Sequence, residues 1–180
     1  MIVSPTGFAG LFVLEPRVHG DARGYFMESY NRQTLLKEGI DIVFVQDNQS
    51  RSSRGVLRGL HYQRAPHAQT KLVRVLSGTV LDVVVDLRRS EPTFGKHFAV
   101  ELSAENKKQV LVPKGFAHGF LVLSETAEVF YKCDEFYHPQ ADGGIHYQSV
   151  KIDWQLPPDK LLLSDKDKNL PSIQDAKFSF

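Results

Sequence analysis

The sequence predicts a mainly β protein, built as a barrel or sandwich with few short helices. Two observations support this fold class. Short apolar runs of strand length recur along the chain between turn residues, and helix signals are scarce. A chain of 180 residues is long enough to bury a sizeable core in one unit, so we expect residues 1–180 to form a single domain.

The clearest strand signal runs from Leu81 to Leu87. Its odd positions are apolar, whereas Asp82 and Asp86 occupy even positions. This period of two predicts a strand with one buried and one solvated face. Ser77-Gly78 is a turn signal that separates it from the preceding predicted strand, Lys71 to Leu76.

Other elements follow from weaker patterns. The best helix candidate is Arg32 to Glu38, with Asn31 as its N-cap and Gly39 just beyond its end. After Trp154 the chain turns proline-rich and charged, and we expect this tail to wrap the barrel as loops and short helical turns. Further strands are expected over Phe98–Leu102, Gln109–Val112, Phe120–Leu123 and Glu128–Cys133.

Charge and composition narrow the function classes. The formal net charge of +1 gives no field suited to wrapping nucleic acid. No apolar run approaches the roughly 20 residues that span a bilayer, and the N-terminal segment lacks the features of a signal peptide. Cys133 is the single cysteine, so no intrachain disulfide forms. We expect a cytoplasmic protein with no nucleic-acid or membrane partner.

Two histidines are candidates for chemistry. His61 and His118 are each either a hydrogen-bonded structural histidine or a general base, since imidazole titrates near pH ~6.5. A metal site is the third alternative, because Pro113-x-Gly115-x-x-His118 resembles the second half of the cupin signature. The first half needs His-x-His, but the chain has Gln63 at the second position, and an amide is a poor ligand for a transition metal. We therefore expect no metal.

Polar groups within apolar strands add further candidates. Tyr131 is either a core aromatic or a general acid that protonates a carbanion. Lys71 shares a strand face with valines, so it is either a strand-end residue reaching water or a cation aimed at a developing oxyanion. Arg58 can assist only if a bulge at Gly59 brings it to the same face as His61.

Two further residues are candidates. Asp167 follows Ser164 at capping-box spacing, so its carboxylate either supports a helical turn or orients a histidine base. Cys133 is best interpreted as a buried structural thiol.

Together, these segments closely resemble the dTDP-4-dehydrorhamnose 3,5-epimerase family of the cupin superfamily, from about Leu14 to Pro171. The resemblance implies a cupin-type jelly roll. The blocks that carry it occur in the expected order: DARGYFMESYN, FVQDNQS, GVLRGLHYQ, KLVRVLSGTVLDVVVDLR, PTFGK, PKGFAHGFLVLSE, YKCDEFYHP and LSDKD.

The resemblance also implies roles for individual residues. His61 is the expected base, held by Asp167, and Tyr131 is the expected acid. Lys71 and Arg58 face the ketone oxygen, with His118 close by. Arg23, Glu28, Gln46, Asp47 and Asn48 are expected to hold the thymidine diphosphate part of the substrate. Tyr137 is expected to line the site, and Asp142 and Lys166 are the remaining substrate-binding candidates. Asp142 stands where some relatives have Glu, so this sequence departs from the pattern of those relatives by a shorter carboxylate.

The implied reaction inverts C3 and C5 of dTDP-4-dehydro-6-deoxy-D-glucose and gives dTDP-4-dehydro-L-rhamnose, without cofactor. A homodimer is implied, because N-terminal groups of this family act across the dimer interface. The alternative within the family is a mono-epimerase that inverts only C3 or only C5 in a deoxysugar pathway. A non-catalytic cupin that binds a sugar nucleotide and a metal-dependent cupin enzyme are the alternatives from other classes.

Overall fold

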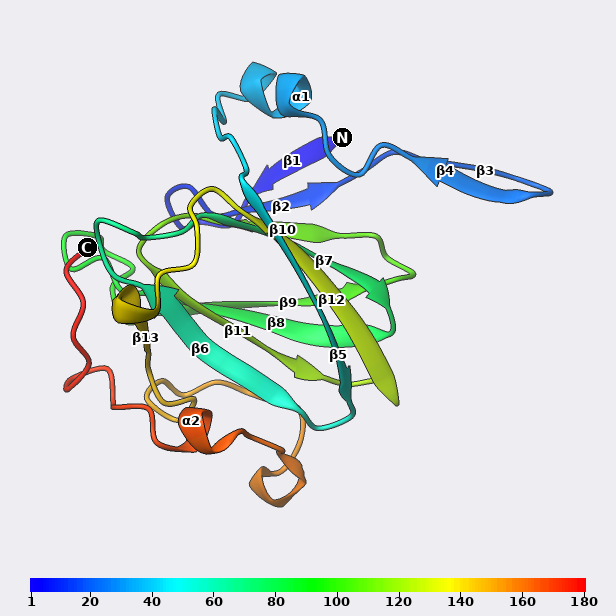
Figure 1. Ribbon diagram of the computed structural model, residues 1–180. Coiled ribbons are helices and arrows are strands. Elements are labelled where there is room, and N and C mark those ends of the chain that lie inside the picture. The colour runs from blue at the N-terminus through cyan, green and yellow to red at the C-terminus, as the bar shows by residue number, and fades with distance from the viewer.

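The computed structural model describes all 180 residues and consists mainly of two antiparallel sheets that face each other (Figure 1). The first sheet has the order β1 (Ile2–Pro5), β2 (Phe12–Glu15), β10 (Gln109–Val112), β7 (Lys71–Ser77), β12 (Thr126–Cys133) and β5 (Gln46–Ser53). The second has the order β13 (Asp142–Gly144), β6 (Leu57–Gln63), β11 (Phe116–Val122), β8 (Thr79–Asp86) and β9 (His97–Ser103). The prediction of a mainly β fold is confirmed.

Short elements complete the structure. A two-stranded hairpin of β3 (Val18–Asp21) and β4 (Gly24–Met27) projects away from both sheets (Figure 1). The helices are α1 (Arg32–Lys37), α2 (Asp165–Lys168), η1 (Pro139–Ala141) and η2 (Pro158–Lys160). No helix has the length and apolar character needed to cross a membrane.

The helix α1 forms where the sequence predicts it. The side chain of Asn31 accepts hydrogen bonds from the N–H groups of Gln33 and Thr34, which would otherwise lack partners. Gly39, with φ of 78°, follows the helix and allows the chain to reverse. Leu35 then packs against the outer face of the six-stranded sheet.

Strand β8 corrects one prediction. The apolar odd positions, Leu81 to Leu87, pack outward against the C-terminal tail, which covers that face. The even positions point between the two sheets, where Val80 and Val84 join the central core. Asp82 follows the same alternation and is 1% exposed. Both faces of β8 are buried, so the expected solvated face does not exist.

The C-terminal tail wraps the five-stranded sheet as predicted. It runs as loops, η2 and the single turn of α2 across the outside of this sheet (Figure 1). Trp154, Ile173 and Ala176 from the tail are buried against Leu57 and Leu60 of β6. Because the tail packs on this sheet, α2 lies beside β6. An isolated β-bridge between Val56 and Leu162 also joins the tail to the residue before β6.

Candidate functional site

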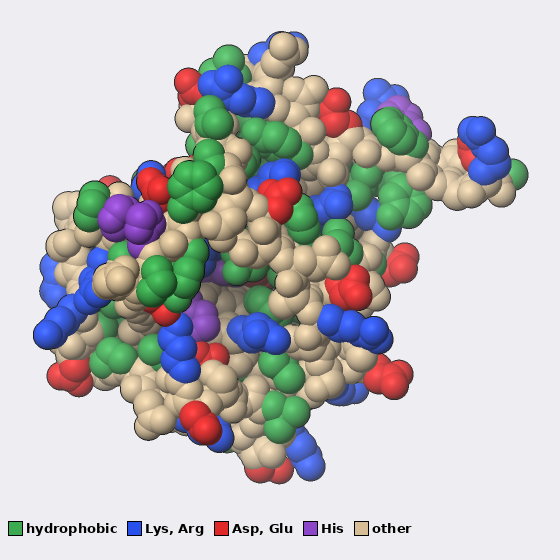
Figure 2. All heavy atoms as spheres, in the orientation of Figure 1, with side chains coloured by type: hydrophobic (Ala, Val, Ile, Leu, Met, Phe, Trp, Pro, Cys, Tyr) green, Lys and Arg blue, Asp and Glu red, His purple; other side chains and the backbone are tan.

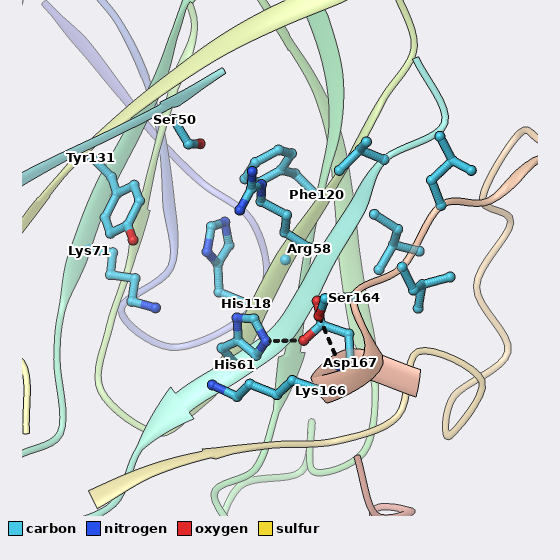
Figure 3. A pocket seen from close by; sticks show the side chains of 15 residues that line it. Ser50, Arg58, His61, Lys71, His118, Phe120, Tyr131, Ser164, Lys166 and Asp167 are labelled. Carbon is cyan, nitrogen blue, oxygen red and sulfur yellow. Dashed lines mark hydrogen bonds and ion pairs between the residues drawn. The ribbon is translucent and has the colours of Figure 1, made fainter. Parts of the chain in front are cut away.

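A cavity of about 510 Å³ opens between the two sheets (Figure 2). Its size suits a ligand that is buried on most sides. Polar side chains from both sheets and from the tail line it (Figure 3). They are Ser50, Arg58, His61, Lys71, His118, Tyr131, Ser164, Lys166 and Asp167. All of these except Ser50 and Ser164 are site residues that the sequence predicts.

His61 and Asp167 form a hydrogen-bonded pair although 106 residues separate them in the sequence. The Nε2 atom of His61 lies 2.6 Å from Oδ1 of Asp167 (Figure 3). The Ser164 hydroxyl accepts a hydrogen bond from the Asp167 N–H at 3.1 Å, which caps α2 and fixes the carboxylate. Both interpretations of Asp167 therefore hold, since it completes a capping turn and also orients the imidazole.

The electrostatics of Asp167 favour its charged form. Burial alone would raise the pKa of this carboxyl, since the side chain is 5% exposed. The hydrogen bond and charge of His61 and the N–H of Gly59 lower the pKa by more, so it lies below its usual value. Because Oδ1 of Asp167 pairs with Nε2 of His61, Nδ1 is the ring nitrogen left to accept a proton.

A bulge at Gly59 brings Arg58 and His61 to the same cavity. His61 pairs with His118 and Arg58 pairs with Phe120, so β6 carries one residue more than β11 between these two pairs. Leu57 and Leu60, three residues apart, both pack against the tail. The sequence-based prediction of a bulge is confirmed.

Tyr131 and Lys71 come from the sheet opposite to His61. Tyr131 lies on β12 and Lys71 on the adjacent β7, and the Lys71 ammonium lies 5.7 Å from the centre of the Tyr131 ring (Figure 3). Burial raises the pKa of the Tyr131 phenol, and the charge of Arg58 only partly opposes this. The phenol therefore stays protonated at neutral pH and is available as an acid.

Burial acts on Lys71 in the opposite direction. It lowers the pKa of this ammonium, and the negative charges of Asp142 and Asp82 oppose the change only in part. A poorly solvated cation in a cavity is suited to stabilise an oxyanion, because little water screens it.

Asp82 is a residue of the site that sequence reasoning assigns to solvent. Its Oδ2 atom lies 2.8 Å from Nε2 of His118, and both side chains are buried. The Oδ1 atom of Asp82 has no hydrogen-bond partner although it is buried. The sequence places Asp82 at an even position of β8, and alternation therefore assigns it to one face of the strand. Alternation does not show whether that face contacts solvent or is buried.

Gln63 explains why the cupin metal position is not available. Its amide nitrogen donates to the carbonyl groups of His67 and Phe136, and its amide oxygen accepts the N–H of His138 at 2.6 Å. Both ends of the side chain are occupied by backbone groups outside the cavity. The residue set at His61 and His118 therefore does not fit a cupin metal centre.

The rim of the cavity carries several of the predicted substrate-binding residues. Lys166 donates a hydrogen bond to Asp142, and the Tyr137 hydroxyl lies 3.5 Å from the same carboxylate. The shorter carboxylate at 142 thus makes contacts within the chain itself. Gln46 accepts the N–H of Tyr137 at 2.9 Å and donates to Asn48 at 3.1 Å, which joins β5 to this rim.

Three predicted residues do not reach the cavity of this chain. Asp47 lies on the outer face of β5 and pairs with Lys132 at 2.9 Å. Arg23 lies in the hairpin of β3 and β4, with its side chain 90% exposed and paired with Asp21. Glu28 follows the hairpin and accepts a hydrogen bond from Asn31. The hairpin bearing Arg23 extends away from the cavity opening (Figures 1 and 2).

Comparisons with known proteins identify the family of the chain. Residues 5–175 match the family model of dTDP-4-dehydrorhamnose 3,5-epimerase. The chain is 50% identical to the dTDP-4-dehydrorhamnose 3,5-epimerase of Shigella flexneri over 179 residues, which cover 99% of each chain. It superposes on the crystal structure of the Elizabethkingia anophelis enzyme of the same name with a TM-score of 0.93, at 50% identity and 97% coverage of each chain.

A third comparison concerns a protein with bound ligands. The Bacillus anthracis dTDP-4-dehydrorhamnose 3,5-epimerase, solved with TDP and PPi bound, matches with a TM-score of 0.91 at 47% identity, over 94% of this chain and 98% of that one. These matches confirm the predicted cupin-type jelly roll and disfavour the mono-epimerase alternative. The chain therefore belongs to the dTDP-4-dehydrorhamnose 3,5-epimerase family, and its activity is that of a 3,5-epimerase.

Proposed function

We propose that this chain inverts C3 and C5 of dTDP-4-dehydro-6-deoxy-D-glucose, with His61 as the base and Tyr131 as the acid. The observation that supports these roles is the placement of the two side chains on opposite sheets of one cavity. Inversion needs this arrangement, because a single acid–base residue returns the proton to the face that it left.

The first step removes a proton from a carbon next to the C4 ketone. Nδ1 of His61 accepts the proton, and the electron pair of the C–H bond moves onto the ketone oxygen to give an enolate. Asp167 stabilises the imidazolium that results, since its carboxylate accepts the Nε2–H at 2.6 Å. General-base catalysis of this type contributes about 10²- to 10⁴-fold.

The enolate oxygen needs positive groups nearby. Lys71 supplies a charge that water screens poorly, and Arg58 and His118 line the same cavity. Each preorganised donor of this kind stabilises the transition state by about 3–4 kcal/mol.

The last step returns a proton from the opposite face. The Tyr131 hydroxyl gives its proton to the carbon as the enolate collapses to the ketone, and solvent then restores the phenol and removes the proton from His61. The same cycle acts at the second carbon. No electrons leave the substrate overall, so the chemistry requires no nicotinamide.

The nucleotide portion of the substrate belongs at the rim. Tyr137 offers an exposed ring for stacking on a base, and Lys166 offers a cation beside it. Arg23 has the fork of N–H donors that suits a diphosphate. We propose that it reaches the cavity of a partner subunit in a homodimer. Cys133, a buried free thiol, is compatible with the proposed cytoplasmic location.

Proton NMR of the reaction in deuterated water tests the assignment. The wild-type chain should give a product with deuterium at two carbons, and His61→Ala should incorporate none. Tyr131→Phe should slow inversion more than it slows the wash-in of deuterium at the substrate carbons. Normal exchange in His61→Ala would refute the base, and equal loss of both rates in Tyr131→Phe would refute the acid. Dialysis against chelator should leave the exchange rate unchanged.

A further inference from the structure

A cluster outside the catalytic cavity combines two imidazoles with one carboxylate. It consists of His67, Glu135 and His138, whose ligand atoms all lie within 4.8 Å of one another. The rings of His67 and His138 stack at 3.5 Å between their centres, and Nε2 of His138 lies 3.9 Å from Oε1 of Glu135. The reaction proposed above uses none of these side chains.

The backbone of all three residues is held by glutamine side chains. Gln63, which is 4% exposed, donates to the carbonyl of His67 at 2.8 Å and accepts from the N–H of His138 at 2.6 Å. Gln69 donates to the carbonyl of Glu135 at 2.8 Å. The loop after β6 and the loop after β12 are thus fixed to each other, so the three side chains meet on a rigid base.

The spacing suits a small transition-metal ion. Ligands at about 2.0–2.1 Å from a tetrahedral Zn²⁺ lie about 3.4 Å apart, so the two stacked imidazoles must separate and turn their ring nitrogens toward one point to bind the ion. Two imidazoles and a carboxylate match the preference of Zn²⁺ for nitrogen and oxygen donors, and the half-buried position leaves room for a water as fourth ligand. Calcium and magnesium, which require oxygen donors, fit poorly.

We propose that His67, Glu135 and His138 form a Zn²⁺ site that links the loop after β6 to the loop after β12. The ion would bind beside Tyr137, which lies between two of its ligands in the sequence, and would fix the rim of the cavity. It takes no part in proton transfer. The sequence-based expectation was that the protein binds no metal. The proposal departs from this expectation at the rim, whereas no metal is proposed at His61.

Calorimetric titration of the chelator-treated protein with ZnCl₂ tests the site. The wild-type chain should bind one ion per chain, and saturation should raise the melting temperature by about 5 °C or more. His67→Gln and His138→Gln should each weaken binding by roughly 100-fold. His97→Gln, which alters a histidine on the distant edge strand β9, should bind as the wild type does.

Further variants separate the alternatives. Glu135→Gln keeps the shape of the side chain, so it should fold normally and still bind Zn²⁺ more weakly. His61→Gln should bind Zn²⁺ normally, because its cavity is a separate site. Three results would each overturn the proposal. They are undiminished binding in all three rim variants, loss of binding in His61→Gln, and no binding of Zn²⁺ to the wild-type chain at ~0.1 mM ZnCl₂. Deuterium exchange at the substrate serves as an independent readout, and the rim variants should retain it.

Discussion

His118 and Asp82 form a second hydrogen-bonded pair inside the cavity wall, with Nε2 and Oδ2 2.8 Å apart. The partners lie on adjacent strands, β11 and β8, and are 7% and 1% exposed. The other oxygen of Asp82 has no partner, and its charge acts on Lys71. Asp82 therefore affects two groups of the site without lining the cavity itself.

Asp82→Asn should separate these two effects. The amide oxygen still accepts from His118, but the charge that opposes the lowering of the pKa of Lys71 is gone. The alkaline limb of the pH–rate profile should therefore move to lower pH. Asp82→Ala, as the comparison, leaves a buried donor on His118 without a partner and should cost about 1–3 kcal/mol of stability in urea denaturation. An unchanged alkaline limb in Asp82→Asn would contradict the electrostatic role.

Lys71→Met should make the protein more stable and less active. Burial lowers the pKa of Lys71 from its usual value of 10.5, so the folded state binds the proton less well than the unfolded state. The charge therefore costs stability below the lowered pKa, and stability rises with pH from there to the usual value of 10.5. Lys71→Met should lack this rise and should lose about 10²- to 10³-fold in kcat. Urea denaturation as a function of pH measures the first effect, and equal slopes in both proteins would contradict it.

Asp167 has the opposite dependence on pH. Its pKa in the folded state lies below its usual value of 3.8, so its stabilising effect is present above that value. The effect is lost as pH falls through the lowered pKa. Asp167→Asn should therefore be less stable than the wild type at pH 6, with a difference that shrinks below about pH 4. It should also lower kcat by roughly 10²- to 10⁴-fold, because the imidazolium loses its counter-charge. A stability difference that persists unchanged at pH 3 would contradict the linkage.

Local patterns in the sequence predicted most of the fold. The capping residue Asn31, the turn at Gly78 and the alternation on β8 each reflect short-range physics, and the structure confirms each element. Alternation could say which residues of β8 share a face, but it could not say which faces are covered. The tail that buries the odd positions lies more than 60 residues later in the chain, and so Asp82 was assigned to solvent.

The site likewise contains residues that local patterns identify and residues that only the folded chain brings together. Tyr131 and Lys71 were recognisable as polar groups on apolar faces, and Gly59 gave a local reason for a bulge. The partner of His61 was not recognisable from spacing, because 106 residues separate it from Asp167. The zinc ligands were missed for a similar reason, since only the glutamine contacts between two loops bring His67 to His138.

Gly59→Ala tests whether the bulge assembles the site. A Cβ at this position would lie 2.7 Å from the Cα of Gly119 and 2.8 Å from the carbonyl oxygen of His118, at a φ of 126°. Neither contact can relax without moving β11, so the substitution should cost about 2–4 kcal/mol and lower the exchange rate of substrate protons. Gly95→Ala also has positive φ but meets no atom within 4 Å, and it should cost only about 1 kcal/mol. Similar losses in the two variants would mean that backbone strain alone explains the effect.

The hairpin of β3 and β4 offers a test of the proposed dimer. Tyr25 and Phe26 are 59% and 71% exposed on an isolated two-stranded ribbon, which is marginally stable unless another surface covers it. A symmetric dimer would cover both hairpins in equivalent contacts and carry each Arg23 to the other subunit. Tyr25→Ser with Phe26→Ser should therefore shift the mass measured by light scattering from dimer to monomer.

Mixing two inactive variants tests where Arg23 acts. Arg23→Ala removes the hairpin cation, and His61→Ala removes the base, so each homodimer should be nearly inactive. In a mixed dimer, the His61→Ala chain supplies an intact hairpin to the intact cavity of the Arg23→Ala chain. Random exchange of subunits makes about half of the dimers mixed, each with one working site, so activity should recover to roughly a quarter of the wild-type value. If Arg23 acted on the cavity of its own chain, every site in the mixture would lack one of the two residues and mixing would restore nothing.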